Sequence, residues 1–359
     1  MAVQAIFAGE LICGIWPGAK RPPGKPSGRV AILIPAHNEA AGISETLHSL
    51  KQVCPADATI LVVADNCSDD TADVARAAGV IVTERVDPLN RGKGFALDHG
   101  RKALSKSDYS VAIILDADCL PEKDSIEALA TAAEGGVPAQ SVNLLSPGTG
   151  RGPMVEISSF AFMIKNLIRQ RGLVRSGGPA LLTGTGMAFP RELFERLPLA
   201  TGNIVEDLAL TVRLAGQRIR PRLEPNARVW SAPAAAEDTL IQRERWEHGF
   251  LETALRFGLP SILSGLRNRN WVEARLGLHL LVPPLVLLFL VTGAVLLAGL
   301  AGIAAGMAPA FAVAVGISLT LSIIALAAAW WTEGRSFLAF RTLLRIPGYM
   351  LWKIPVYLK

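Results

Sequence analysis

The hydrophobic residues in the first half of the chain form short unbroken runs. Four of these runs cover residues 30–34, 59–64, 80–83 and 111–115. Each consists mostly of Val, Ile, Leu and Ala, as is typical of a strand that is buried on both faces of a parallel sheet. The stretches between the runs have the length and pattern of helices. Strands that alternate with helices in this way predict βαβ units and a parallel α/β sheet.

Polar and charged residues gather after the runs. They form four segments, residues 35–39, 65–71, 91–94 and 116–118. Ligands of open α/β sheets bind beyond the carboxyl ends of the strands. We therefore expect these four segments to meet at one edge of the sheet and to form the functional site.

Asp116 and Asp118 follow the fourth run directly, with one residue between them. On an extended backbone alternate side chains point the same way, so both carboxylates could face one site. Such a pair suits a divalent cation that bridges to phosphate oxygens. In the alternative interpretation, Asp118 only caps a helix that begins near Pro121. The stretch alone does not decide between the two.

The other polar segments also have structural alternatives. Glu39 would suit the first turn of a helix, and Asp65 could end a strand in an Asx turn. Ser68 or Asp69 could cap the next helix. The loop around Lys93 could be solvated, although glycines on both sides of it allow a ligand to approach the backbone closely. Capping does not explain why acids, a lysine and a DxD all converge on one edge.

The order of these segments resembles that of glycosyltransferase family 2, which has a GT-A fold. The closest resemblance is to the membrane-anchored members of the cellulose-synthase-like superfamily, with their D, DxD, ED and QxxRW pattern. It runs from about Arg29 to Trp246. The matching segments are IPAHNE (34–39), VADNCSDD (63–70), RGKG (91–94), DAD (116–118), GTGMAF (184–189), ED (206–207) and QRERW (242–246).

The resemblance implies a role for each segment. Asp65 and Glu39 would hold the base and ribose of the nucleotide, and Asp118 would ligate Mg²⁺ or Mn²⁺ at the diphosphate. Asp207, next to Glu206, would be the general base. The residues implied in nucleotide-sugar binding are Pro35, His37, Glu39, Asp65, Lys93 and Asp116. Those implied where acceptor and diphosphate meet are Gln242, Arg245, Trp246, Gly184 and Gly186.

The chemistry of sugar transfer is consistent with these roles. The departing diphosphate must be neutralised, which a metal on Asp118 could do with help from Lys93 and Arg245. The acceptor hydroxyl needs a base within hydrogen-bonding distance, here Asp207. Trp246 could pack against a sugar ring. The structural alternatives are a helix cap for the acid pair and an ordinary amphipathic helix for the QxxRW segment.

Two departures from the family pattern affect the predicted activity. The motif often written TED is Val205-Glu206-Asp207 here, so its Thr is missing, while the proposed base is retained. The FxVTxK gating segment of processive synthases has no match. Transfer of a single sugar is therefore at least as well supported as processive synthesis.

Composition points to the membrane. Half of the residues are hydrophobic, the mean hydropathy is +0.35 and the net charge is +5. With apolar spans present, this basic excess favours anchoring on the cytoplasmic side over nucleic-acid binding. The four cysteines form no CxxC pair, so neither a zinc site nor a disulfide framework is indicated.

Two long apolar stretches, residues 276–303 and 310–331, could each span a bilayer. Basic residues flank the pair on both sides, so the positive-inside rule puts both flanks in the cytoplasm. We therefore expect a multi-pass protein of the cell inner membrane with a cytoplasmic catalytic domain. Residues 337–358 are apolar but carry three basic residues, and we interpret them as an interfacial helix and not as a third span.

The remaining segments complete the predicted organisation. Residues 1–17 are apolar but lack a signal-peptide pattern, and residues 154–175 suggest an amphipathic helix at the membrane surface or over the acceptor site, or else a plain surface helix. The predicted parts are an N-terminal segment and linker (1–28), a GT-A catalytic domain (29–231), the QxxRW helix with an interface segment (232–275), two transmembrane helices (276–332) and a C-terminal amphipathic cytoplasmic segment (333–359).

The sequence therefore favours an inverting, metal-dependent glycosyltransferase. It would move a sugar from a nucleotide sugar, with UDP favoured by resemblance alone, to a lipid-linked or polysaccharide acceptor. One alternative is another nucleotide-dependent transferase, such as a nucleotidyltransferase, which has no need of the ED and QxxRW segments. The other is a non-catalytic membrane protein with a nucleotide-binding-like domain.

Overall fold

The computed structural model describes residues 1–18, 24–147, 152–200, 206–232 and 236–357, with the backbone alone at residues 206, 236–246 and 356. The chain divides into two compact units. The first, here called the sheet unit, consists of residues 18–144 and 179–232. The second, here called the helical unit, consists of residues 1–17, 145–178 and 233–359. Each is described by itself.

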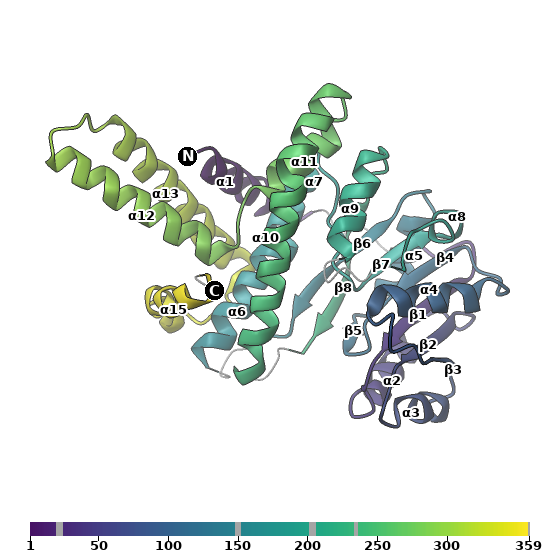
Figure 1. Cartoon of the computed structure of the whole chain (residues 1–359). Helices are drawn as coiled ribbons and strands as arrows, with labels where there is room; N and C mark the ends of the chain where they lie inside the picture. Colours follow the sequence, from purple (N-terminus) through teal and green to yellow (C-terminus); the bar gives the residue numbers. More distant parts are fainter. Residues whose placement is uncertain (19–23, 148–151, 201–205, 233–235, 358–359) are drawn as a thin grey trace. The chain divides into compact units, whose positions relative to one another are not determined.

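The sheet unit contains a mixed eight-stranded sheet with the order β3-β2-β1-β4-β7-β6-β8-β5 (Figure 1). Its first four strands pair in parallel, as predicted, and β4 then pairs antiparallel with β7. The strands are β1 (Val30–Ala36), β2 (Thr59–Asp65), β3 (Ile81–Arg85), β4 (Val111–Ile114), β5 (Cys119–Pro121), β6 (Ala139–Leu145), β7 (Met187–Pro190) and β8 (Arg222–Ser231). The sequence predicted a parallel sheet, and this prediction is correct only for the half formed by β3, β2, β1 and β4.

Helices cover both faces of this sheet. They are α2 (Ile43–Val53), α3 (Thr71–Ala77), α4 (Lys93–Leu104), α5 (Ser125–Ala133), α8 (Arg191–Phe194) and α9 (Glu206–Gly216). Ile32 of β1 belongs to a core with α2 and α5, whereas the adjacent Leu33 belongs to a second core with α4 and α9. Successive side chains of a strand point to opposite faces. Because both faces are covered, the strand is apolar throughout.

The helix expected near Pro121 begins later. Cys119 and Leu120 pair antiparallel with Ser231 and Trp230 of β8, and α5 begins only at Ser125. The backbone of this segment thus finds its hydrogen-bond partners in a sheet edge. Asp118 is not the cap of a helix, and its alternative structural interpretation is wrong.

The helical unit is built from α1 (Ala2–Gly14), α6 (Pro153–Met163), the π-helix η1 (Ile164–Arg169), α7 (Gln170–Arg175), α10 (Ala236–Arg267), α11 (Trp271–Leu280), α12 (Leu285–Ala304), α13 (Ala310–Ala329), η2 (Trp330–Gly334), α14 (Phe340–Leu343), α15 (Ile346–Trp352) and α16 (Ile354–Tyr357). Helices α12 and α13 pack against each other as a hairpin (Figure 1). By length and composition, Leu285–Ala304 and Ala310–Gly334 could cross a membrane.

The first of these helices begins nine residues later than the predicted start of the span at Leu276. Residues 276–280 are the end of α11, and Pro283 and Pro284 separate α11 from α12. A proline has no backbone N–H to donate and clashes with the preceding turn, so one continuous helix does not form here. His279 consequently belongs to a buried helix of the unit and not to an apolar span.

The N-terminal helix α1 is packed inside the helical unit. Its Glu10 is fully buried and accepts hydrogen bonds from Arg169 Nε at 2.9 Å and Arg275 Nη2 at 2.8 Å. His279 Nδ1 lies 2.9 Å from the same carboxylate. Gln4 bonds to Thr292 of α12. These contacts fix α1 against several helices that are distant in the sequence.

The segment predicted as an amphipathic surface helix is instead an interior element. Helices α6, η1 and α7 follow one another directly, and Arg169 and Arg171 are both buried. Arg171 pairs with Glu333 at 2.8 Å. Arg169 and Arg171 misled the sequence interpretation because acids from distant segments, the buried Glu10 and the half-buried Glu333, neutralise them.

Candidate functional site

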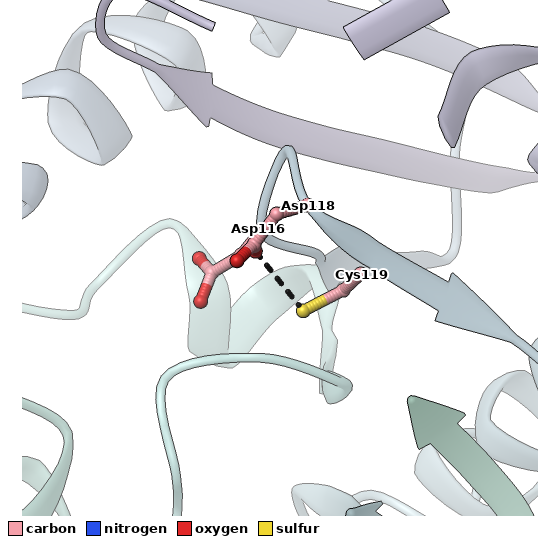
Figure 2. A group of neighbouring side chains, drawn as sticks. All are labelled: Asp116, Asp118 and Cys119. Atoms are coloured by element: carbon pink, nitrogen blue, oxygen red, sulfur yellow. Dashed lines mark hydrogen bonds between the residues drawn. The ribbon is translucent and has the colours of Figure 1, made fainter. Parts of the chain in front are cut away.

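The loop between β4 and β5 brings together Asp116, Asp118 and Cys119 (Figure 2). One potential ligand atom from each of them lies within 4.8 Å of the others. Cys119 contacts Asp118 Oδ1 at 3.5 Å and Ser231 Oγ at 3.1 Å. Burial raises the pKa of the Cys119 thiol. The two carboxylates are hard oxygen donors, which fit an ion such as Mg²⁺ or Mn²⁺.

The acids at this edge of the sheet influence one another. Partial removal from water, followed by the nearby charge of Asp116, raises the pKa of Asp118. Removal from water, followed by the charges of Asp118 and Asp116, raises the pKa of Glu39. Glu39 thus belongs to the same acidic group as the DxD. Such a concentration of negative charge attracts a cation.

Lys93 introduces a positive charge beside this group. It is the first residue of α4, preceded by Gly92 with φ 124°. Its ammonium group pairs with Asp116 and donates to the carbonyl oxygen of Gly184 at 2.8 Å. The backbone N–H of Asp116 donates to Thr185 Oγ1 at 3.1 Å. The RGKG, DAD and GTGMAF segments are thereby joined.

Two glycines of the GTGMAF segment adopt positive φ values, 83° at Gly184 and 61° at Gly186. A Cβ on Gly184 would lie 3.2 Å from Lys93 Nζ and 3.4 Å from Asp207 Oδ2. A Cβ on Gly186 would lie only 1.9 Å from Ser141 Oγ. Both positions require glycine for their backbone conformation and for the close approach of other groups. Lys93 and Asp207 therefore lie on the same side of Gly184.

Asp207 is the second residue of α9. Its Oδ1 accepts a hydrogen bond from the N–H of the next residue, Leu208, at 2.7 Å, whereas the side chain of a helix cap bonds to an N–H two or three residues further along. Its carbonyl oxygen accepts from Thr211 Oγ1, which in turn accepts from the N–H of Leu182. The N-terminal turn of α9 is thus tied to the segment that leads into Gly184. The side chain of Glu206 lies outside the described residues.

At the end of β2, Asp65 is largely buried and accepts a hydrogen bond from Arg85 Nη1 at 2.7 Å. His37 Nδ1 lies 2.7 Å from the carbonyl oxygen of Asp65, and Pro35 lies within β1 opposite Val63. The residues predicted for donor binding that follow β1 and β2 therefore lie together. Gln242, Arg245 and Trp246 belong to α10 of the helical unit, but their side chains lie outside the described residues.

Some supporting residues of the site were not anticipated from the sequence. Arg85 holds Asp65 in place, and its position at the end of the third strand was the available signal. Gln140 of β6 bonds to the backbone on both sides of Gly184, accepting from Thr183 N at 3.0 Å and donating to Thr185 O at 2.9 Å. No local pattern indicated this contact, because it joins segments that are far apart in the sequence.

Comparisons with known proteins identify the family. The model described as "Glycosyltransferase like family 2" matches residues 26–249, more than half of the chain. A probable glycosyltransferase of Bacillus subtilis is 29% identical over 249 residues, covering 64% of this chain and 57% of the relative. A poly-β-1,6-N-acetyl-D-glucosamine synthase of Staphylococcus epidermidis is 25% identical over 241 residues, covering 65% of this chain and 57% of the relative.

The fold is also that of a glycosyltransferase. The solved structure of a mannosyltransferase from Pyrobaculum calidifontis, in complex with GDP-Man and Mn²⁺, aligns with a TM-score of 0.56 at 17% identity. The alignment covers 99% of this chain and 90% of the mannosyltransferase. The chain spans 57% of the length of the two curated relatives named above. The GT-A fold predicted from the sequence is confirmed, and the chain belongs to glycosyltransferase family 2.

Proposed function

We propose that this protein is an inverting, metal-dependent glycosyltransferase that moves a sugar from a nucleotide-sugar donor to a lipid-linked or polysaccharide acceptor at a membrane. The observation that carries the proposal is the arrangement around Gly184. Lys93 bonds to its carbonyl oxygen and to Asp116, and Asp207 approaches the same glycine. Sugar transfer from a nucleoside diphosphate requires positive charge beside the diphosphate and a base beside the acceptor. The lysine, the DxD and the separate acid at one sheet edge meet these requirements.

At the donor end, Asp65 and Glu39 would hold the base and ribose, with Pro35 and His37 beside them. The hydrogen bond from Arg85 orients the carboxylate of Asp65 for such a contact. The preference for UDP rests on the family resemblance, whereas the mannosyltransferase named above was solved with GDP-Man. The donor nucleotide is therefore the first property to measure.

At the diphosphate, Asp118 would hold Mg²⁺ or Mn²⁺, with Asp116 contacting the nucleotide. When bound, the metal would offset the negative charge of the departing diphosphate. Lys93 supports this role because its ammonium group is already fixed beside Asp116. Fixed charges of this kind stabilise a leaving group without reorganisation during the reaction.

At the acceptor end, Asp207 would take the proton of the attacking hydroxyl, with Glu206 beside it. A single displacement assisted by one base inverts the anomeric centre, so an α-linked donor would give a β-linked product. Gly186 would keep the GTGMAF segment close-packed, and Gln242, Arg245 and Trp246 of α10 would line the place where acceptor and diphosphate meet.

Membrane association is supported by α12 and α13, which are long and apolar enough to cross a bilayer. Basic residues before and after the pair favour cytoplasmic flanks, so the sheet unit would face the cytoplasm at the inner membrane. Nucleotide sugars made in the cytoplasm would then reach the site directly. The likeness to a polysaccharide synthase is consistent with this placement.

The test uses the full chain, purified in detergent and incubated with UDP- and GDP-sugars together with a membrane lipid extract. We expect one nucleotide sugar to release its diphosphate in a metal-dependent way and to label an extracted acceptor. Asp108→Asn, which changes an exposed acid of the same unit, serves as the control variant. Absence of sugar transfer from every donor, under conditions where the protein is folded and binds nucleotide, would contradict the proposal.

A further inference from the structure

The C-terminal segment, residues 346–357, is bonded to the helix that carries the QxxRW residues. The segment consists of α15, Lys353 and α16 (Figure 1). Lys353 is buried and pairs with Oε1 of Glu247 in α10. The hydroxyl of Tyr357 donates to the other oxygen of the same carboxylate, Oε2, at 2.7 Å. Both carboxylate oxygens of Glu247 are therefore bonded to one segment that lies about a hundred residues further along the chain.

The groups in this contact have the protonation states that it needs. Burial, followed by the charge of Glu247, raises the pKa of Tyr357, so its hydroxyl keeps the proton that it donates. Lys353 Nζ also lies 5.7 Å from the ring centre of Tyr357, within the range of a cation–π contact. Removing one partner of a buried ion pair leaves an uncompensated charge and is strongly destabilising. The contact is therefore costly to break.

Glu247 lies in a part of α10 that is distant from the packing of α10 against α11. A Cβ on Gly277 of α11 would lie only 2.6 Å from the carbonyl oxygen of Gly258 in α10, so the two helices are in close contact there. Glu247 lies about three turns before Gly258, whereas α11 ends at Leu280. Pro260 also interrupts the hydrogen bonds of α10 between its two parts. Contacts with other elements must therefore fix the first part of α10, and the contact at Glu247 is one of them.

The position of Glu247 on the helix leaves the QxxRW face free. An α-helix has about 3.6 residues per turn, which puts positions 242, 245 and 246 on one face of α10 and position 247 on another. The backbone is helical throughout this stretch. A contact at position 247 can therefore hold the helix without covering the face that the proposed function assigns to the acceptor and the diphosphate.

We infer that Glu247, Lys353 and Tyr357 are positioning residues for sugar transfer: the C-terminal segment holds α10 through the carboxylate of Glu247 and thereby fixes where the QxxRW residues lie. This inference rests on the proposed function, which gives the QxxRW residues their role. Asp116, Asp118 and the residues proposed for donor binding belong to the sheet unit. Loss of the contact should therefore reduce turnover and leave nucleotide binding close to normal.

The first test measures the contact independently of the reaction, by amide hydrogen exchange of the full chain in detergent. Tyr357→Phe removes only a hydroxyl, and Lys353→Met removes the charge from a side chain of similar length. Both should speed the exchange of residues 236–250. For Lys353→Met we expect roughly a tenfold increase, because a broken buried pair makes local opening easier. Glu252→Gln, which changes an exposed acid of the same helix, is the matched control and should leave this exchange unchanged.

The second test separates positioning from stability. The double variant Glu247→Gln, Lys353→Met leaves neither member of the ion pair as an unpaired buried charge, so its thermal stability should return towards that of the unmodified protein. Its sugar transfer at saturating donor should nevertheless stay roughly tenfold lower or more, because small misplacements of groups at a reacting centre reduce the rate strongly. Nucleotide titration should give an affinity like that of the unmodified protein.

Two results would overturn the inference. The first is unchanged exchange of residues 236–250 in both Tyr357→Phe and Lys353→Met. The second is sugar transfer that recovers together with thermal stability in the double variant, which would show that the contact is structural only. If the unmodified protein transfers no sugar, the proposed function fails, and the exchange measurement still decides whether the C-terminal segment holds α10.

Discussion

The ammonium group of Lys93 lies 2.8 Å from the carbonyl oxygen of Gly184 and donates a hydrogen bond to it. The same ammonium pairs with Asp116. A residue at the start of α4 is thereby held between the DxD loop and the GTGMAF segment. The carbonyl oxygen that holds it belongs to a glycine with φ 83°. The backbone conformation of Gly184 therefore determines where the positive charge lies beside the proposed diphosphate site.

Replacing Gly184 should therefore damage the site more than the fold. In Gly184→Ala the new Cβ would lie 3.2 Å from Lys93 Nζ, and an alanine at positive φ costs roughly 1–2 kcal/mol. Gly136 has the same φ of 83° with open space around it, which makes Gly136→Ala a matched control. Both variants should lose similar thermal stability, but only Gly184→Ala should lose most of its turnover. Equal turnover in the two variants would show that the position of Lys93 is unimportant.

Asp207 and Asp118 should fail in different ways. Asp207→Asn keeps the size of the side chain but removes the proton acceptor, so turnover should fall by roughly two to four orders of magnitude, with donor binding unchanged. Asp118→Asn should weaken metal-dependent nucleotide binding as well. Steady-state kinetics and nucleotide titration at several Mn²⁺ concentrations would separate the two. Near-normal turnover of Asp207→Asn, or full activity in excess EDTA, would contradict the assignments.

The stability of the helical unit should fall in mild acid. Burial lowers the pKa of His279, so the folded protein prefers the neutral ring. The associated stability is present above the unfolded pKa of about 6.5. It is lost as the pH falls from there towards the folded pKa, at up to about 1.4 kcal/mol per pH unit. Thermal unfolding in detergent between pH 7.5 and pH 5.5 would measure this.

His279→Gln should show a smaller loss of stability over the same pH range than the unmodified protein. His48→Gln, which changes an exposed histidine of the sheet unit, should retain the full loss. Glu10 adds little in this range. Burial alone would raise its pKa, but the surrounding His279, Arg169 and Arg275 hold the pKa of Glu10 far below its usual value.

The α12–α13 hairpin gives a prediction about membrane topology. A reporter inserted near Gly306, in the turn between the two helices, should lie on the outer side of the inner membrane. One fused after Lys359 should lie in the cytoplasm, because the basic flanks favour that side. Paired phosphatase and fluorescent-protein fusions would measure both positions. Reporters that lie on the same side would rule out a spanning hairpin.

The sequence predicted the parallel half of the sheet because three of its strands, β1, β2 and β4, are buried on both faces and therefore form unbroken apolar runs. β6 escaped this reasoning, since Gln140, Ser141 and Asn143 interrupt its apolar pattern and are nevertheless buried. At least one of these side chains supports the site, since Gln140 fixes the backbone around Gly184. A polar residue that is buried because it makes a tertiary contact interrupts the apolar pattern, so the local sequence does not indicate the strand in which it lies.

The same limit applies to the buried charges. Arg169 was interpreted from the sequence as part of an amphipathic surface helix. It is buried instead, because its partner Glu10 lies 159 residues away in the sequence. The order of the D, DxD and ED segments could be recognised because it is a property of the linear sequence. Ion pairs between distant segments form only in the folded protein and cannot be recognised in this way.

The packing of α1 has a consequence for the order of folding. Its Glu10 precedes Arg275 by 265 residues, and its Gln4 precedes Ser322 by 318. During synthesis the helix therefore exists long before the residues that neutralise and hold it. Contacts with such large sequence separation form late. The strands and helices of the sheet unit can assemble meanwhile, and the docking of α1 onto the later helices would complete the helical unit only after both of its apolar helices have been made.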